Sequence, residues 1–373
     1  MKVLHVTYDM RIGGTEMVIK NIIEGNTDAN INMSIYCIEA PLGPWGEDLA
    51  QSGISITMQE RKPGFDTSLI SALRQHIKEN NIDILHCHQY TPWVYGALAA
   101  AFTKTKVIFT EHGRFYPDST SWKRKLVNPI LLFFTSKVTA ISKATSDALV
   151  NYEFIPSRSI DIVYNGIKPL AVKQKEVEAL RSQLRLNETD IILGTIARFD
   201  PIKNQLLMIN AFADAAKDRD DLYLLLVGDG EMRQALQQEV DRLEILDRVI
   251  FTGYIANPAN YLALMDVFLL SSLSEGTSMT LLEAMSLGKP CVVTNAGGNA
   301  EVITHNLNGL VTENDNKNAF ATAIIQLTQH HEMRRNFGKN AIEKFELQFS
   351  AQKMNEAFRI QYNHLIAVGS VRS

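Results

Sequence analysis

The sequence predicts an α/β protein made of two doubly wound domains with parallel sheets. The chain has 373 residues, which suits two domains of roughly 150–200 residues each. Short apolar runs alternate with helical patterns from end to end, as in parallel α/β sheets. The alternation stops and restarts once near the middle of the chain. We therefore expect two successive modules whose sheets present their carboxyl ends to a shared central cleft, where ligands of open α/β folds bind.

The first module is expected to hold five strands separated by helices. Its strand-like runs are KVLHVTY, NMSIYCI, DILHCH, KVIFTEH and KVTAIS, at residues 2–8, 32–38, 83–88, 106–112 and 137–142. Helical patterns fill the gaps, for example TEMVIKNIIEG at 15–25 and SLISALRQHIKEN at 68–80. The runs are apolar and rich in β-branched residues, which favours strands buried on both faces.

The second module repeats the pattern. Its expected strands are IILGTIAR, LYLLLVGDG, RVIFTGY, DVFLLSS, CVVTN and GLVT, at residues 191–198, 222–230, 248–254, 266–272, 291–295 and 309–312. Asn165-Gly166 and Pro169 punctuate the segment between the modules, which marks it as the connection. We expect domains at 1–165 and 166–350, with a last helix at about 351–367 packing back on the first.

Composition excludes several classes of protein. Hydrophobic residues make up 46% and charged residues 21%, as in ordinary globular proteins. A net charge of −4 does not suggest bulk binding of nucleic acid. The three cysteines are far apart in apolar runs, so no disulfide or metal framework is expected and a reducing cytoplasm fits. The N-terminal run has no signal-peptide pattern, and no stretch has the length of a membrane span.

The stretch SEGTSMTLLEAMSLGKPCVVT, residues 274–294, carries two glutamates after a buried strand. Thr280 and Glu283 fit a capping box, and Glu275 fits a solvated loop. However, a carboxylate accepts two hydrogen bonds at once, which suits the diol of a sugar or ribose ring. A helix N-terminus nearby would offer N–H groups to a phosphate. Together these features favour a nucleotide-sugar site.

This stretch closely resembles the E-x7-E hallmark of the retaining GT-B glycosyltransferases of family four, in the glycogen-synthase-like superfamily. The resemblance covers nearly the whole chain and implies the GT-B fold, with two Rossmann-like domains facing a central cleft. It places Glu275 on the donor sugar and Glu283 on the ribose diol. The chain departs from the family at Ser286, where alanine is usual, and at Cys291, where valine is usual. The turn expected to bind phosphate consists of Gly276, Thr277, Ser278, Met279 and Thr280.

The segment ARFDPIKN contains a second part of the expected site. Arg198 and Lys203 would ordinarily be surface charges, but the family has R-x4-K at this place. Fixed cations stabilise the negative charge that a leaving diphosphate gains, and one such donor is worth roughly 3–4 kcal/mol. The resemblance therefore assigns both residues to the leaving group. With these cations and a helix N-terminus present, we expect no metal ion and no other cofactor.

The first module is expected to contribute two further groups. Gly13-Gly14 alone predicts only a tight turn, and a Rossmann fingerprint is absent because no third glycine follows. With Glu16, however, the pair matches the family loop GGxE, whose backbone closes over the donor phosphate. His112 matches the family histidine that contacts the transferred sugar. His88 is interpreted as a residue of the acceptor side, and His86 as a structural residue on the same strand face.

Other candidates are weaker. Gly228 and Gly230 by themselves predict only a turn before a helix. The resemblance implies that this segment borders the donor nucleotide and that Tyr254 lies near the base. Asp218 and Asp220 form a D-x-D pattern that precedes a strand, so we interpret them as solvated charges.

Residues 104–143 carry a local net charge of +6 together with Trp122, and include Arg114 and Asp118. This region fits either a basic surface helix or a patch that docks on anionic lipid, which would make the protein peripheral to a membrane.

The expected activity is transfer of a sugar from a nucleotide diphosphate sugar to an acceptor hydroxyl, with retention at the anomeric carbon. UDP is favoured by its frequency in the family, and the acceptor is expected to be a glycan or a lipid-linked group in cell-surface polysaccharide or glycolipid synthesis. A catalytically silent nucleotide-sugar-binding subunit and a GT-B sugar-nucleotide epimerase are the alternatives. An oxidoreductase is disfavoured by the missing third glycine.

Overall fold

The computed structural model describes residues 1–113 and 120–370. The chain divides into two compact units. Unit 1 contains residues 1–168 and the segment from 350 onward, and unit 2 contains residues 169–349. Each unit has its own parallel sheet and its own buried core.

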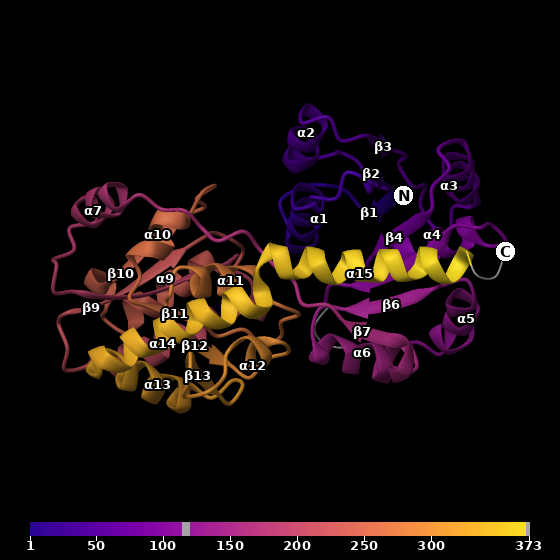
Figure 1. The fold of residues 1–373 in the computed structure, drawn as a ribbon. Helices are drawn as coiled ribbons and strands as arrows, with labels where there is room; N and C mark the ends of the chain where they lie inside the picture. The colour runs from indigo at the N-terminus through magenta and orange to yellow at the C-terminus, as the bar shows by residue number, and fades with distance from the viewer. Residues whose placement is uncertain (114–119, 371–373) are drawn as a thin grey trace. The chain divides into compact units, whose positions relative to one another are not determined.

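Unit 1 is built on a sheet of seven parallel strands in the order β3-β2-β1-β4-β5-β6-β7 (Figure 1). The strands are β1 (Lys2–Thr7), β2 (Asn32–Cys37), β3 (Ile56–Met58), β4 (Ile84–His88), β5 (Lys106–Glu111), β6 (Lys137–Ala140) and β7 (Ile160–Ile162). The order reverses between β1 and β4, which is the topological switch point of a doubly wound sheet. The two edge strands, β3 and β7, were not predicted because each has only three residues.

Helices flank this sheet. They are α1 (Gly14–Glu24), α2 (Pro44–Gln51), α3 (Thr67–Glu79), α4 (Tyr90–Ala100), α5 (Trp122–Phe133), α6 (Lys143–Glu153) and α15 (Ala351–Ser370). The C-terminal helix α15 returns to unit 1, where Asn355 Nδ2 donates to the Asn21 carbonyl of α1 at 3.0 Å. Phe358 and Tyr362 of α15 are buried, with the Phe358 ring 5.0 Å from the ring of His86 in β4. This helix therefore covers a sheet face that carries histidines.

Unit 2 repeats the arrangement with six parallel strands in the order β10-β9-β8-β11-β12-β13. The strands are β8 (Ile191–Ile196), β9 (Leu222–Val227), β10 (Val249–Gly253), β11 (Val267–Leu270), β12 (Cys291–Thr294) and β13 (Gly309–Thr312). The switch point lies between β8 and β11, which are hydrogen-bonded neighbours. The carboxyl ends of these two strands therefore open at the place where ligands bind in such sheets.

Helices also flank the sheet of unit 2. They are α7 (Gln174–Gln183), α8 (Gln205–Ala215), α9 (Arg233–Arg242), α10 (Ala259–Leu264), α11 (Met279–Ser286), α12 (Asn299–Val302), α13 (Lys317–Gln329) and α14 (His331–Lys344). Helix α8 is apolar on most of its surface and is buried between the sheet, α9 and α13. The predicted class, α/β with two Rossmann-like doubly wound sheets, is confirmed.

Candidate active site

The carboxylate of Glu275 is held in place at the carboxyl end of β11. The Lys203 ammonium Nζ lies 2.7 Å from Glu275 Oε1, and the Ser272 hydroxyl donates to the same oxygen at 2.6 Å. The Glu275 side chain is 8% exposed and the Lys203 side chain 26% exposed. Glu275 is thus not a solvated loop residue. Two residues that the sequence placed in one site, 72 positions apart, form a direct ion pair.

Asp200 shapes the loop that carries the two predicted cations. The Arg198 guanidinium donates through Nε to Asp200 Oδ2 at 2.8 Å and forms an ion pair with it. Asp200 also caps the short helix Pro201–Lys203, accepting the Lys203 backbone N–H at 3.0 Å. Asp200 therefore fixes the backbone of Lys203 and orients Arg198, whose side chain remains 77% exposed. An exposed guanidinium that keeps unused donors can still reach an anion.

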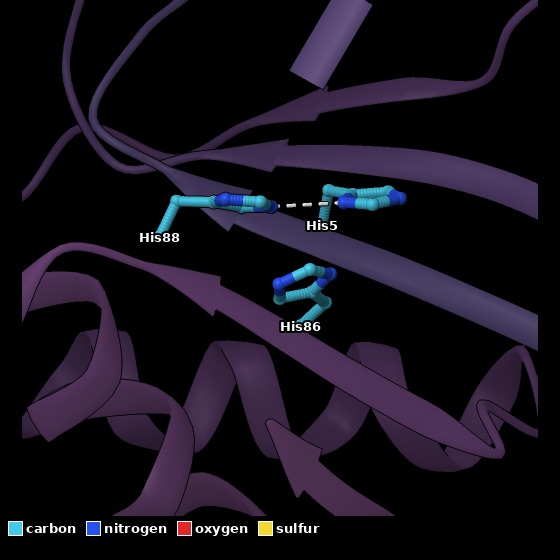
Figure 2. Close-up of side chains that lie close together, drawn as sticks. All are labelled: His5, His86 and His88. Carbon is cyan, nitrogen blue, oxygen red and sulfur yellow. Dashed lines mark hydrogen bonds between the residues drawn. The ribbon is translucent and has the colours of Figure 1, made fainter. Parts of the chain in front are cut away.

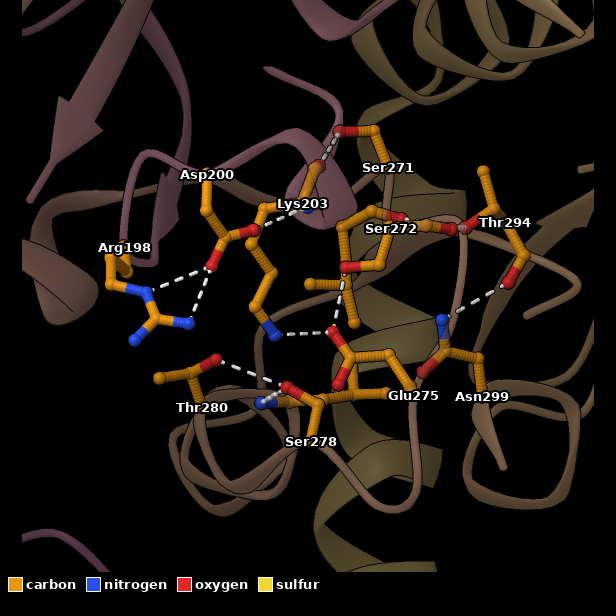
Figure 3. Close-up of polar contacts among 12 residues, drawn as sticks. Arg198, Asp200, Lys203, Ser271, Ser272, Glu275, Ser278, Thr280, Thr294 and Asn299 are labelled. Carbon is orange, nitrogen blue, oxygen red and sulfur yellow. Dashed lines mark hydrogen bonds and ion pairs between the residues drawn. The ribbon is translucent and has the colours of Figure 1, made fainter. Parts of the chain in front are cut away.

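Hydrogen bonds tie this loop to the ends of the neighbouring strands, as Figure 3 shows. The Ser271 hydroxyl donates to the carbonyl oxygens of Lys203 and Asn204 at 2.9 and 3.0 Å. The Thr294 hydroxyl, at the end of β12, donates to the Ser272 carbonyl at 2.6 Å. Asn299 Nδ2 in turn donates to the Thr294 carbonyl at 3.1 Å. These hydrogen bonds thus link the segments that follow three neighbouring strands of the sheet, β8, β11 and β12, at their carboxyl ends.

The glycine pair after β12 brings a second loop against Glu275. Gly297 has a φ of +52°, and a Cβ built there would lie 1.7 Å from the Glu275 carbonyl oxygen. Only glycine allows this approach, because the obstacle is backbone and cannot move aside. Gly298 N–H then donates to the same carbonyl at 3.3 Å. The position of Glu275 is therefore fixed from both its backbone and its carboxylate.

The predicted phosphate-binding turn leads directly into α11. Ser278 is the N-cap, and its hydroxyl accepts from Leu281 N–H at 3.4 Å and lies 3.2 Å from the Thr280 hydroxyl. Thr277 and Ser278 are buried, and Gly276, Met279 and Thr280 are half-buried. The turn starts one residue after Glu275, so any anion bound at this helix N-terminus would lie close to that carboxylate.

Glu283 is set apart from Glu275 by its surroundings. With the cap at Ser278, Glu283 occupies the fifth position of α11 and cannot close a capping box, which needs the third. Its carboxylate makes no hydrogen bond within the described residues, and burial raises its pKa to about 7. A carboxylate that lacks protein partners in a half-buried position is free to accept hydrogen bonds from a ligand.

The remaining predicted residues of unit 2 divide into two kinds. Gly230, with a φ of +157°, lets its loop contact the backbone of Phe199, since a Cβ there would lie 2.3 Å from the Phe199 carbonyl oxygen. Gly228 lies in the same loop, which therefore supports the Arg198 loop from the β9 side. Tyr254, in contrast, follows β10, is 64% exposed, and makes no hydrogen bond or ion pair with another predicted residue in the described part of the protein.

Unit 1 contains the second group of predicted residues. Gly13 is the N-cap of α1 and Gly14 its first residue. The Glu16 carboxylate folds back over this turn, because a Cβ on Gly13 would lie 2.3 Å from Glu16 Oε2. Burial, together with the nearby charge of Asp9, raises the pKa of Glu16 to about 7. The GGxE segment thus forms the start of helix α1, and the carboxylate of Glu16 lies against the Gly13 backbone at that helix N-terminus.

His112 follows β5, where its Nε2 atom lies 2.9 Å from His88 Nδ1. Burial lowers the pKa of His112 to about 3, so the ring is neutral at physiological pH. His88 therefore contacts His112 directly, which the sequence did not indicate. His86 is fully buried, with Nδ1 2.8 Å from the Tyr362 hydroxyl of α15 and Nε2 2.7 Å from Thr110 Oγ1. These contacts fit the structural role assigned to His86.

Counting charges along the sequence overstated the basic region 104–143. Arg124 forms an ion pair with Glu153 at 2.7 Å, Lys137 with Asp161 at 2.5 Å and Lys143 with Asp147 at 3.5 Å. All three carboxylates come from outside the counted segment, so they were missed. Arg114 and Asp118 lie outside the described residues.

Asp218 and Asp220, the D-x-D pattern, are exposed at the amino end of β9, as expected of solvated charges.

The sequence reasoning missed Asp200, Ser272 and Gly297. Asp200 precedes a proline, which is a pattern for a helical N-cap and could have been used. Ser272 and Gly297 gain their roles only from contacts between strand ends, which one sequence does not reveal.

Two protein-family models match this chain. The model described as Glycosyl transferases group 1 matches residues 176–344, and the model described as Glycosyltransferase Family 4 matches residues 12–169. N-acetyl-alpha-D-glucosaminyl L-malate synthase of Bacillus anthracis is 32% identical over 306 residues, covering 80% of this chain and 79% of that protein. UDP-Gal:alpha-D-GlcNAc-diphosphoundecaprenol alpha-1,3-galactosyltransferase of Escherichia coli is 24% identical over 344 residues, covering 88% of each chain.

Solved structures agree with these matches at the level of the fold. HepE of Anabaena in complex with UDP has a TM-score of 0.87 at 22% identity, covering 98% of this chain and 100% of that one. Sucrose-phosphate synthase of Thermosynechococcus elongatus has a TM-score of 0.78 at 18% identity, covering 98% and 99%. The likeness spans both units and shows the GT-B fold that the resemblance implied. From the two family matches and the relative of 32% identity, we conclude that the chain belongs to family 4 of the glycosyltransferases.

Proposed function

We propose that this glycosyltransferase moves a sugar from a UDP-sugar to an acceptor hydroxyl with retention at the anomeric carbon, without a metal ion. The acceptor is a glycan or lipid-linked group in the synthesis of a cell-surface polysaccharide or glycolipid. Two relatives support the choice of donor and acceptor. One is named as a UDP-Gal galactosyltransferase of a diphosphoundecaprenol-linked sugar, and HepE was solved with UDP and with UDP-glucose.

The ion pair between Lys203 and Glu275 is the observation that carries the proposal. Both groups are partly desolvated, and each is the ion-pair partner of the other. A bound diphosphate offers Lys203 stronger acceptors than one carboxylate, and sugar hydroxyls offer donors to Glu275. Binding a donor therefore exchanges one internal pair for two ligand contacts. Such an exchange needs a cation and an anion side by side, which suits a diphosphate joined to a sugar.

The leaving group is stabilised by charges that the protein already holds. Lys203 and Arg198 lie in one short loop, and the turn 276–280 opens the N-terminus of α11 beside them. Negative charge that develops on the diphosphate as the glycosidic bond breaks is met by fixed cations and N–H groups. Glu275 positions the sugar, and Glu283 accepts hydrogen bonds from the ribose diol. The sugar contact of His112 is carried over from the family resemblance alone.

Helix α5 carries a surface suited to an anionic bilayer, which would place the enzyme beside a lipid-linked acceptor. Trp122, Leu126, Ile130 and Phe133 recur along one side of α5 and are exposed, and Phe102 is exposed near its end. The exposed Lys123 and Lys125 occupy the same helix. An apolar stripe flanked by lysines is typical of helices that lie in the membrane interface. No helix among the described residues is long and apolar enough to cross a membrane.

A panel of nucleotide sugars tests the proposed function. A ligand that binds only the folded state raises the melting temperature, so a screen of UDP-, GDP- and ADP-sugars identifies the donor. Transfer or hydrolysis of that donor, with release of nucleoside diphosphate, then supports an enzyme. Donor binding without turnover in the presence of glycan and lipid-linked acceptors points to a silent binding subunit. Conversion of the donor to its epimer identifies an epimerase, and a preference for nicotinamide dinucleotides contradicts the proposal.

A further inference from the structure

Four histidines meet on one face of the unit 1 sheet. His5 in β1 and His86 in β4 are register partners across a parallel pair. His88 comes two residues after His86 and therefore points to the same face, and His112 follows the end of the neighbouring strand β5. His5, His86 and His88 are fully buried. Figure 2 shows His5 and His88 joined edge to edge, with His86 beside them.

Three of the four rings form a linear chain of hydrogen bonds. His5 Nδ1 lies 2.9 Å from His88 Nε2, and His88 Nδ1 lies 2.9 Å from His112 Nε2. Both nitrogens of His88 are therefore used. Each end of the chain keeps one further nitrogen, and these two atoms, His5 Nε2 and His112 Nδ1, are buried without a hydrogen-bond partner in the described part of the protein.

All three rings are neutral at physiological pH. Burial lowers the pKa of His5 and of His112 to about 3. Burial, and then the neighbouring histidines, hold the pKa of His88 well below its usual value. A neutral imidazole carries one proton, so one nitrogen donates and the other accepts.

With one proton on each ring, only two arrangements satisfy both hydrogen bonds. If every proton is on Nδ1, His5 donates to His88, His88 donates to His112, and His112 presents an N–H at its outer nitrogen. If every proton is on Nε2, the direction reverses and His112 presents a bare lone pair on Nδ1. Any mixed set leaves at least one of the two hydrogen bonds with two protons or with none, in a buried place where unsatisfied groups are unfavourable.

We propose that His5, His88 and His112 change tautomer as one unit, and that His5 and His88 are positioning residues that decide whether His112 Nδ1 donates or accepts a hydrogen bond. What His112 meets rests on the proposed function, whereas the coupling of the three tautomers does not. A sugar hydroxyl can pair with either form. A phosphate oxygen or the carbonyl of an acetamido group only accepts, so it selects the arrangement with every proton on Nδ1.

A metal ion is the other use of closely spaced imidazoles, and the ring geometry disfavours it. Nitrogens of His5, His86 and His88 lie within 4.8 Å of one another. However, the rings of His86 and His88 are stacked, with centroids 4.1 Å apart and planes inclined by 29°. The lone pair of an imidazole lies in the ring plane, so stacked rings do not aim at one point. Both nitrogens of His86 also already have hydroxyl partners.

Nuclear magnetic resonance of the full chain labelled with ¹⁵N-histidine tests the proposal. Scalar coupling across an N–H···N hydrogen bond identifies donor and acceptor directly, and the ring-nitrogen shifts show which nitrogen carries the proton. Among the nine histidines we expect one set of three rings joined by two such couplings at pH 7, all protonated on the same nitrogen. A set protonated on different nitrogens, a charged member, or rings without couplings overturns the proposal.

A variant of the central ring gives a second readout. His88→Phe keeps a ring against His86 but removes both nitrogens, so His112 should lose its single tautomer and show averaged shifts. Tyr362→Phe is the matched control, because it removes a hydrogen bond to His86 from the same core and leaves the chain of three intact. An unchanged single tautomer of His112 in folded His88→Phe overturns the proposal. If this variant does not fold, the couplings in the wild-type protein decide.

Activity separates this proposal from the proposed function. With a donor that the wild type transfers, His88→Phe should lower kcat about 10- to 1,000-fold, below the roughly 10⁴-fold loss that a wrong histidine tautomer causes in a protease triad. The donor Kd should change less than about threefold, and Tyr362→Phe should keep kcat. Couplings without any transfer contradict the proposed function alone. Transfer with mixed tautomers contradicts the tautomer chain alone.

Discussion

The pair formed by Lys203 and Glu275 can be tested by removing each charge alone and both together. At 2.7 Å, two unit charges attract by about 6 kcal/mol at an effective dielectric constant of 20. Most of this is offset by desolvation, so the net coupling should be about 1–3 kcal/mol. The two single variants should differ. Lys203→Gln strands a carboxylate that is 8% exposed, whereas Glu275→Gln strands an ammonium that is 26% exposed. We therefore expect Lys203→Gln to be the more destabilising.

The free energy of unfolding from urea titrations measures the effect. Once Glu275 is neutral, removing the lysine charge should cost little, so the double variant should be about as stable as Glu275→Gln alone. Lys173 and Glu176 form a matched control pair at 2.9 Å in the same unit, with side chains 81% and 50% exposed. Exposed pairs contribute little, and their cycle should show no measurable coupling. If the two single changes at Lys203 and Glu275 add within about 0.5 kcal/mol, the pair does not couple and this reasoning is wrong.

The same variants separate the roles of the two charges toward a nucleotide. Glu275→Gln frees the Lys203 ammonium for a diphosphate, so UDP should bind as tightly as to the wild type or more tightly. Lys203→Gln removes a cation from the phosphate site and should weaken UDP binding by about tenfold or more. Calorimetric titration with UDP measures both. Equal losses of UDP affinity in the two variants would show that Glu275 contacts the nucleotide and not the sugar.

Three further predictions concern pH, metal and membrane. The pKa of Glu283 is raised to about 7, which means that the folded state favours the neutral, protonated carboxyl group. The free energy of unfolding should therefore fall as pH rises from 4.5 through about 7, by up to about 3 kcal/mol. Glu283→Gln should lose this pH dependence of the unfolding free energy, and an unchanged profile would place the titration elsewhere. Transfer should survive EDTA, and activity that a divalent ion alone restores would contradict the metal-free leaving group. Lys123→Gln with Lys125→Gln should weaken binding to anionic vesicles roughly 30-fold, at about 1 kcal/mol per lysine. The matched control is Lys173→Gln with Lys175→Gln in unit 2. Equal losses of vesicle binding in the two double variants, or vesicle binding that does not change with salt, would show that α5 is ordinary surface. If the protein instead forms concentration-dependent dimers that Phe133→Ser abolishes, the exposed side of α5 binds a second copy of the protein.

Much of the fold could be predicted because parallel strands buried on both faces read as apolar runs. The strands β8, β9, β11 and β12 all coincide with such runs. The edge strands β3 and β7 could not be found in this way, because three half-buried or exposed residues leave no clear apolar signal. The restart of the pattern after Pro169 also anticipated a second sheet with its own switch point.

The candidate site could be predicted only as a list of residues. The spacing of Glu275 and Glu283 and the loop of Arg198 and Lys203 named the main groups. That Lys203 reaches Glu275 depends on how loops from β8 and β11 meet, and the sequence contains no sign of it. Charge counting failed for Arg124 for the same reason, because Glu153 approaches it from another helix. Contacts between distant segments are what a single sequence leaves out.

Release of nucleoside diphosphate from a UDP-sugar, measured with wild type and Glu275→Gln at saturating donor, tests the central claim most directly. The account predicts that the wild type releases UDP in step with a glycosylated acceptor. It also predicts that Glu275→Gln binds UDP at least as well but loses turnover by about 100-fold or more, since a group that holds the sugar acts mainly in the transition state. Equal turnover by both proteins, or a wild type that neither binds nor cleaves any nucleotide sugar, would contradict the account.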